Sequence, residues 1–147
     1  MILYTIGFTQ KSAEQFFELL KTHRVQLLVD IRLNNRSQLA GFTKGTDLEY
    51  FLRALCGCQY VHCTQYAPTK EILARYQKSR PHDWDAYVQA FLPLMRQRQA
   101  AQDFCRRFSG YEAVCLLCSE PTAEHCHRRL LAELIAEQDP TIQICHL

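Results

Sequence analysis

The chain has 147 residues, of which 48% are hydrophobic and 22% are charged. This composition excludes an extensively disordered protein, because a chain of this length and apolar content can bury its own core. We expect one domain over residues 1–147. The formal net charge of +2 neither demands nor excludes a nucleic-acid partner, since dedicated nucleic-acid binders usually carry a larger basic excess.

Apolar runs alternate with amphipathic stretches along the chain. This alternation favours a three-layer α/β domain, with a mainly parallel sheet of about four to five strands flanked by helices. The expected strands are residues 2–6, 27–31, 59–63 and 113–117, with 142–145 as a closing strand at the edge. The expected helices begin near Ser12, Thr46, Thr69, Asp83 and Glu124.

Two segments have the spacing of a capping box, residues 12–15 and 46–49, in which two side chains satisfy the first helical N–H groups. Asp83 is the expected cap of a helix whose apolar residues recur at spacings of three and four, which predicts a buried stripe. Pro93 lies inside this helix, so we expect a kink or a restart there.

The N-terminal sequence lacks a charged region and a small-residue cleavage site, so no secretory signal is expected. No run of about 18 apolar residues occurs, so no membrane span is expected either. The eight cysteines are therefore expected to be reduced thiols in the cytoplasm, where they serve as core residues, metal ligands or nucleophiles.

In an open parallel sheet, ligands bind beyond the carboxyl ends of the strands. The reactive residue types of this chain stand at those ends and at the start of the last helix. We therefore expect one site there, without a cofactor. The candidate residues are Thr9, Asp30, Arg32, Cys118, Glu120, Cys126, His127 and Arg128.

Cys126 is expected in the first turn of the last helix, where unpaired N–H groups and the helix dipole lower the pKa of a thiol. Arg128 adds positive charge and makes the helix start a candidate anion site. Cys118 or Cys126 is thus a candidate nucleophile and His127 a candidate acid or base. Glu120 is a candidate to orient His127 or Arg128.

A packing role is an open alternative for the same residues. His127 continues an apolar stripe on the last helix, and Cys126 can act as a small buried hydrophobe. A zinc site at Cys118, Cys126 and His127 is a third interpretation. Cys115 has the CxxC spacing to Cys118, but residues three apart in a strand point to opposite faces, so Cys115 is expected in the core.

The charged residues Asp30 and Arg32 lie at the end of a buried strand. Burying a charge costs free energy unless the charge is paired or takes part in a functional site. A salt bridge that fixes the following loop is one interpretation, and a role in the site is the one we favour. The loop from Arg32 to Lys44 contains no acidic residue. It is expected either to contact phosphate or to form a solvated flap.

Several segments together resemble the domain-of-unknown-function 488 family, and the resemblance spans nearly the whole chain. The most specific is the pattern Cys118, Glu120, Cys126, His127 and Arg128. The other segments are Tyr4–Gly7, Leu28–Arg32, Tyr60–His62, Ala67–Glu71 and Asp83–Trp84.

The resemblance implies a compact α/β domain in which Asp30, Arg32 and the five residues of the closing pattern match signature positions. It implies no particular activity. The chain departs from the family where Phe8 replaces the usual histidine and where Asn34 or Asn35 replaces a proline. We therefore expect any chemistry that depends on that histidine to differ here, and the loop after Arg32 to be less rigid.

Three functions from different classes remain open at this point. The favoured one is a thiol-dependent enzyme acting on an anionic, phosphate-bearing substrate, with Arg32 and Arg128 holding the anion. The second is a module that binds an anionic ligand or nucleic acid without catalysis. The third is a structural or catalytic metal site. The oligomeric state cannot be read from the sequence.

Overall fold

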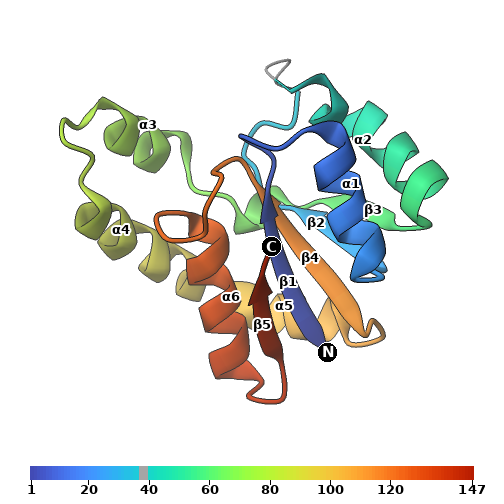
Figure 1. The fold of residues 1–147 in the computed structure, drawn as a ribbon. Helices are drawn as coiled ribbons and strands as arrows, with labels where there is room; N and C mark the ends of the chain where they lie inside the picture. Colours follow the sequence, from blue (N-terminus) through green and yellow to red (C-terminus); the bar gives the residue numbers. More distant parts are fainter. Residues whose placement is uncertain (37–39) are drawn as a thin grey trace.

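The structure is a computed structural model that describes residues 1–36 and 40–147. Its five strands are all parallel and form one sheet in the order β3-β2-β4-β1-β5. Six α-helices flank the sheet within the described ranges (Figure 1). The predicted three-layer α/β fold is therefore confirmed. In chain order the elements are β1 Ile2–Gly7, α1 Ala13–Thr22, β2 Leu27–Asp30, α2 Gly45–Phe51, β3 Gln59–His62, α3 Lys70–Lys78, α4 Trp84–Gln97, α5 Ala100–Phe108, β4 Ala113–Cys118, α6 His127–Gln138 and β5 Gln143–His146.

Two clusters of buried side chains hold the layers together, one on each face of the sheet. In β4, Cys115 and Leu117 belong to the cluster beneath α1 and α2. Val114 and Leu116 belong to the cluster beneath α4, α5 and α6. Alternation along the strand therefore separates Cys115 from Cys118, and the prediction that Cys115 is a core residue is confirmed by its complete burial.

Local sequence signals account for several helix ends. The capping box at α1 forms as predicted, since the Ser12 hydroxyl accepts from the Gln15 N–H and the Gln15 side chain accepts from the Ser12 N–H. Thr69 and Asp83 cap α3 and α4 through the N–H groups of Ile72 and Ala86. The predicted caps at the starts of α1 and α4 are therefore confirmed, because residue type alone indicates such caps.

The predicted capping box at residues 46–49 does not form, and the helix that contains Pro93 does not restart there. The segment 46–49 forms no capping box, because α2 already begins at Gly45 and Lys44 caps it without a side-chain bond. Helix α4 continues through Pro93 to Gln97; the carbonyl that loses its N–H partner belongs to Gln89, which is exposed and can bind water. The interruption comes later, at Gln99, whose φ of 52° starts a separate helix, α5.

The helix α2 is extended by a π-helical turn, Leu52–Cys56. Gly57 ends this turn with a φ of 60°, a left-handed conformation that glycine adopts without steric cost. The turn brings the chain directly into β3, so the segment expected to be helical through Leu55 is helical but changes its winding.

The order of the strands creates a switch point between β1 and β4. The connection from β1 crosses β4 to reach β2, while the connection from β4 crosses β1 to reach β5. The two connections leave adjacent strands in opposite directions, α1 on one face and α6 on the other (Figure 1). A crevice outside the carboxyl ends of two such strands is the usual ligand position in open α/β sheets.

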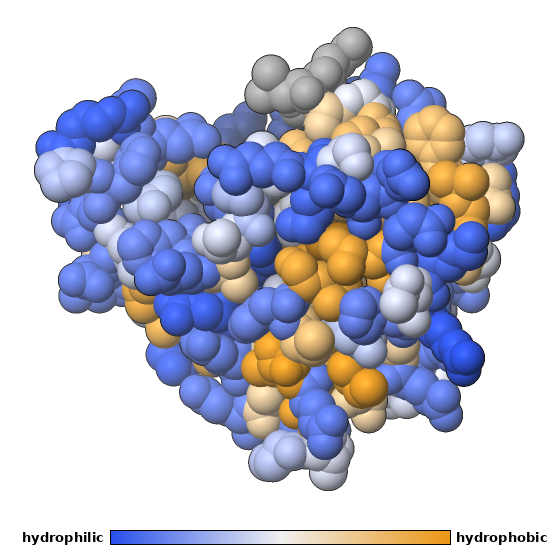
Figure 2. All heavy atoms as spheres, in the orientation of Figure 1, coloured by the Kyte–Doolittle hydropathy of each residue, from blue (hydrophilic) through white to orange (hydrophobic). Residues whose placement is uncertain are grey.

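The surface is mostly polar on the face drawn in Figure 2, with apolar areas at the upper right near α2 and in the middle around the C-terminus and β5. Phe17, Phe42, Phe51 and Leu55 line a shallow groove of about 240 Å³ near α2. None of the helices in residues 1–36 and 40–147 is long and apolar enough to cross a membrane.

Candidate functional site

The carboxyl ends of β1 and β4 meet at Gly7 and Cys118, which are paired in the register of the two strands. The space above Gly7 is filled by the chain that follows β4. A Cβ atom at position 7 would overlap the carbonyl oxygen of Glu120 and lie 3.0 Å from Nη1 of Arg128. Glycine at this position therefore lets the loop after β4 cross the end of β1.

A thiol and an imidazole are in contact at the centre of this edge. Sγ of Cys118 lies 3.5 Å from Nδ1 of His127, the first residue of α6. Nε2 of His127 lies 2.9 Å from the carbonyl oxygen of Ile31, just beyond β2. Because a carbonyl accepts only, Nε2 carries a proton in the neutral ring and Nδ1 is the unprotonated nitrogen. The sulfur also lies 3.8 Å from Nε2, so it lies against the ring and not along the lone pair of Nδ1.

His127 satisfies both interpretations that the sequence left open. It is 8% exposed and packs 5.5 Å from the ring of Phe91, as a core histidine would. The carbonyl of Ile31 nevertheless holds the ring against Cys118, with Nδ1 as the nearer of its two nitrogens to the sulfur. A base held in this way beside a thiol is the usual arrangement for activating a cysteine nucleophile.

The electrostatic environment of the two site cysteines differs. A hydrogen bond from the Cys126 thiol lowers the pKa of Cys118, and the N–H groups of Ser119 and Glu120 and the charge of Arg128 act in the same direction against the opposing effect of burial. Burial raises the pKa of Cys126, and the neighbouring Cys118 raises it further. Of the two thiols, Cys118 is thus the one whose ionised form is favoured, and Cys126 is the one that stays protonated more readily.

The position of Cys126 differs from the prediction. Helix α6 begins at His127 rather than near Glu124, and Cys126 is its N-cap, with an extended backbone at φ −139°. Glu124 and His125 are exposed and offer no apolar face to pack against the sheet. The thiol whose pKa is lowered by neighbouring N–H groups and by the charge of Arg128 is therefore Cys118, at the end of β4.

Arg128 is fully buried beneath the site. Its Nε donates to the hydroxyl of Thr5 at 3.3 Å and its Nη1 to the main-chain carbonyl of Glu120 at 2.7 Å. Its Nη2 is buried without a hydrogen-bond partner among the described residues. The guanidinium has carbonyl and hydroxyl partners, and the thiolate of Cys118 is an anion that it stabilises.

Glu120 and Thr9 do not occupy the roles that the sequence suggested for them. Glu120 meets Arg128 through its main-chain oxygen, while its side chain is exposed at the rim of the cavity. Thr9 is exposed, and its hydroxyl donates to the carbonyl of Ser119. Both residues hold the loop after β4 in place through the backbone.

Asp30 and Arg32 are paired with each other, which is the first of the two interpretations considered. The Arg32 guanidinium donates to both carboxylate oxygens of Asp30, at 2.8 Å and 2.7 Å, and to the carbonyl of Thr43 at 2.7 Å. The hydroxyl of Tyr60 donates to Asp30 at 2.7 Å. Burial opposes the charge of Arg32, but the bonds and charge of Asp30 outweigh it and raise the pKa of Arg32.

The two departures from the family pattern take part in this network. The Arg32 guanidinium lies 5.3 Å from the centre of the Phe8 ring, a cation–π distance. Asn35 donates to the hydroxyl of Tyr60 at 3.0 Å. The described part of the loop after Arg32 is thus attached to the sheet by side chains. Residues 37–39 of the loop expected to contact phosphate lie outside the described residues.

A cavity of about 290 Å³ opens above the thiol. Cys118, Cys126 and His127 line one side of it, and Arg32 and Glu120 lie at its wall. The opposite side is formed by the helical arm α3–α4, whose aromatic residues contribute Tyr76, Trp84 and Tyr87. The spacing of apolar residues on the helix capped by Asp83 predicted a buried stripe, and it did not indicate that Trp84 and Tyr87 share a cavity with Cys118.

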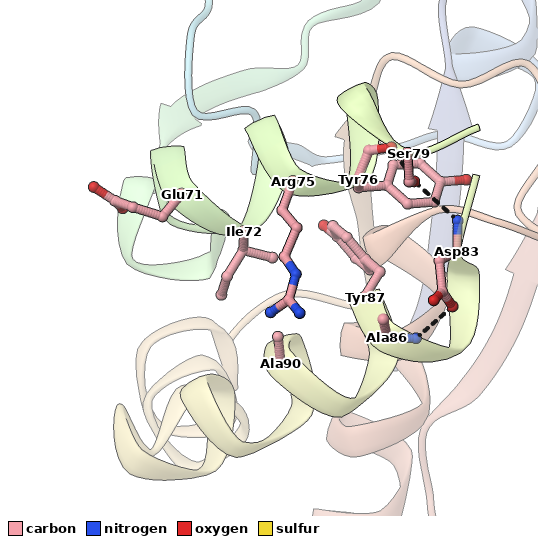
Figure 3. A pocket seen from close by; sticks show the side chains of 9 residues that line it. All are labelled: Glu71, Ile72, Arg75, Tyr76, Ser79, Asp83, Ala86, Tyr87 and Ala90. Carbon is pink, nitrogen blue, oxygen red and sulfur yellow. Dashed lines mark hydrogen bonds between the residues drawn. The ribbon is translucent and has the colours of Figure 1, made fainter. Parts of the chain in front are cut away.

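The aromatic residues of α3 and α4 stack on one another and line two neighbouring cavities. Trp84 stacks on Tyr87 at 5.2 Å between ring centres and on His125 at 5.1 Å. Figure 3 shows a neighbouring cavity of about 210 Å³ between α3 and α4, which Tyr76 and Tyr87 also line. Helix α3 has no fully buried residue, so its position depends on these aromatic contacts with α4.

Three donor atoms of the site could hold a metal ion. The sulfur atoms of Cys118 and Cys126 and a ring nitrogen of His127 all lie within 4.8 Å of one another. Two thiolates and one imidazole are ligands that zinc accepts, with a fourth position left for water or substrate. Since Nε2 of His127 is bonded to Ile31, the ring would offer Nδ1.

The fold and the site define a doubly wound α/β protein with a buried Cys–His pair at its switch point. The model of the family described as domain of unknown function DUF488 matches residues 12–135, and the chain belongs to this family. Neither a curated protein nor a solved structure matches the chain.

Proposed function

We propose that this protein is a thiol-dependent enzyme, with the thiolate of Cys118 as nucleophile and His127 as its acid–base partner. The observation that carries the proposal is the 3.5 Å contact between Cys118 Sγ and His127 Nδ1, with Nε2 fixed on the carbonyl of Ile31. A nucleophile, a base and an orienting group in this order are the parts that covalent thiol catalysis needs.

The charge of Arg128 supports the same proposal. A buried arginine without a carboxylate partner costs free energy, unless an anion shares its surroundings. The hydrogen bond from Cys126, the two loop N–H groups and Arg128 together lower the pKa of Cys118. These groups stabilise the attacking form of the thiol before a substrate arrives.

The cavity supports a substrate whose body is apolar or aromatic and whose electrophilic centre reaches Cys118. Tyr76, Trp84 and Tyr87 offer ring faces and edges across the cavity from the thiol. A volume of about 290 Å³ is close to the lower end of typical ligand pockets. The substrate is therefore a small molecule or the end of a larger one.

An anionic group on the substrate has weaker support than the nucleophile. Arg32 reaches the cavity wall, but its guanidinium is committed to Asp30 and Thr43. Arg128 is fully buried beneath the site. The same two observations weaken the alternative of a phosphate- or nucleic-acid-binding module, which needs exposed and uncommitted cations.

A metal centre is the second candidate function, because three donor atoms converge within 4.8 Å. It predicts about one zinc ion per chain after purification without added metal, and loss of that zinc in Cys126→Ala. The nucleophile proposal predicts a zinc-free protein with a reactive thiol.

The proposal is tested by limited alkylation of the folded protein with iodoacetamide at neutral pH, followed by mapping of the modified cysteine. Eight cysteines are free, and we expect Cys118 to be modified first. Cys118→Ala should lose the fast reaction, while Cys63→Ala, which changes a buried cysteine outside the site, should keep it. Preferential modification of any other cysteine contradicts the proposal.

A further inference from the structure

We propose that Cys118 and Cys126 form an intramolecular disulfide when a hydroperoxide oxidises Cys118, with Cys126 as the resolving thiol. This inference rests on the proposed function in one respect, namely that Cys118 is the nucleophile. It adds a substrate class, the hydroperoxides, and gives the second cysteine of the site a chemical role.

The geometry places the two sulfur atoms together, at the two ends of an irregular segment. Both lie within the 4.8 Å group of donor atoms, and Cys118 and Cys126 are 5% and 2% exposed. Residues 119–126 contain neither helix nor strand. A disulfide needs a sulfur separation of about 2.05 Å, which this irregular segment can supply without disturbing β4 or α6.

The chemistry proceeds in two balanced steps. The thiol of Cys118 passes its proton to His127, the thiolate attacks the terminal oxygen of the hydroperoxide, and the O–O bond breaks. The departing alkoxide or hydroxide takes the proton from His127 and leaves as an alcohol or water. This step converts Cys118 to a sulfenic acid. The sulfur of Cys126 then attacks the sulfur of Cys118, the S–O bond breaks, and the Cys126 proton leaves with the hydroxyl as water.

His127 is positioned to move the proton in the second step. Its Nδ1 lies 3.5 Å from the Cys118 sulfur, within reach of a hydroxyl carried by that sulfur. The thiol of Cys126 belongs to the same group of donor atoms. The imidazole can therefore take the proton from Cys126 and deliver it to the departing hydroxyl.

The other cysteines are poorly placed for either step. Cys115 is completely buried in the layer on the opposite face of the sheet. Burial raises the pKa of Cys58 to about 12, so this thiol stays protonated. The cavity of about 290 Å³ above Cys118 admits a small hydroperoxide directly to the sulfur that reacts.

The test treats the full-length protein with one equivalent of hydrogen peroxide, blocks the remaining thiols in denaturant and digests the chain after glutamate. The bond between Glu120 and Pro121 resists this cleavage, so cuts after Glu112, Glu124 and Glu133 release Cys118 and Cys126 on separate peptides, 113–124 and 125–133. We expect these two peptides to be cross-linked and two of the eight free thiols to be lost. Cys115→Ala should retain the cross-link, which assigns it to Cys118.

Two variants separate the steps. Cys126→Ala should stop at the sulfenic acid of Cys118, which a cyclic 1,3-dione traps, and should form no cross-link. Cys145→Ala, which changes a half-buried cysteine at the sheet edge, should behave as the wild type. Circular dichroism checks that both variants are folded.

The inference is overturned if the wild-type protein keeps Cys126 free while Cys118 is oxidised or still alkylated by iodoacetamide. That result leaves the nucleophile of the proposed function intact. If Cys118 reacts with neither reagent, the proposed function fails together with this inference. Zinc retained on both thiolates also contradicts both.

Discussion

Gly7 lies directly opposite Cys118 in the parallel pair of β1 and β4, and the carbonyl of Glu120 occupies the space that a side chain at position 7 would need. The end of β1 therefore supports the loop that carries two N–H groups to the sulfur of Cys118. The position of these N–H groups beside Cys118 therefore depends on the absence of a side chain at Gly7.

Gly7→Ala should displace this loop, because its Cβ would overlap a backbone atom. Overpacking of this kind costs about 1–3 kcal/mol of the free energy of unfolding. We also expect Cys118 to lose its fast alkylation. Gly110→Ala is the matched control, since a Cβ at Gly110 meets nothing within 4 Å. Equal urea midpoints and alkylation rates for both variants would contradict the support role of Gly7.

Asp30→Asn removes the negative charge that compensates Arg32 at the end of β2. Both side chains are buried, and the ion pair is 2.7 Å long. An uncompensated buried charge typically costs about 3–5 kcal/mol of stability, and urea unfolding should show a loss of this size. Glu18→Gln breaks an exposed pair with Lys21 and should change the midpoint little. A small effect of Asp30→Asn would show that water reaches Arg32.

Arg128→Met tests whether the buried guanidinium serves stability or reactivity. The substitution removes two hydrogen bonds but also removes a buried cation whose Nη2 has no partner among the described residues. We expect the free energy of unfolding to stay within about 1 kcal/mol of the wild-type value, because the two effects offset each other. The rate of Cys118 alkylation at neutral pH should fall, whereas the neighbouring Arg129→Met should keep it. A large loss of stability with unchanged alkylation would make Arg128 a structural residue.

Asp103 should make the fold sensitive to acid. Burial opposes its ionisation, but hydrogen bonds from Tyr66, Arg107 and Arg106 outweigh this effect and lower the pKa of Asp103. A carboxylate with a lowered pKa in the folded state stabilises the protein above its unfolded pKa of about 3.9, and this contribution is lost as the pH falls through the folded value. The urea midpoint of Asp103→Asn should therefore fall less below about pH 4 than that of the wild type. Parallel pH profiles for the two proteins would contradict this.

The closeness of the strand-end residues could be predicted from the sequence, because it follows from the parallel arrangement of the strands. Parallel strands place their carboxyl ends at one edge, so Asp30 and Cys118 had to lie near each other. The helix that follows β4 had to begin at the same edge, which brought His127 to Cys118. Which of the two thiols has the lowered pKa was not predictable, since it depends on which of them donates the hydrogen bond.

The outer wall of the cavity could not be derived from the sequence. The spacing of Trp84, Tyr87 and Phe91 indicated a buried stripe, and Tyr87 and Phe91 are indeed buried. Whether such a stripe packs against the sheet or faces a cavity depends on how α3 and α4 lie beside it. That placement is a tertiary contact between helices, for which a periodic pattern carries no information.

The most direct test of the account is the pH dependence of Cys118 alkylation by iodoacetamide, measured in the wild type and in Cys126→Ala. The account predicts a half-maximal rate in the wild type below the ordinary cysteine pKa of about 8.5. It also predicts a shift to higher pH in Cys126→Ala, because the hydrogen bond that contributes most to the lowered pKa of Cys118 is removed. A wild-type midpoint at or above about 8.5, unchanged in the variant, would show that Cys118 is an ordinary buried thiol and would contradict the account.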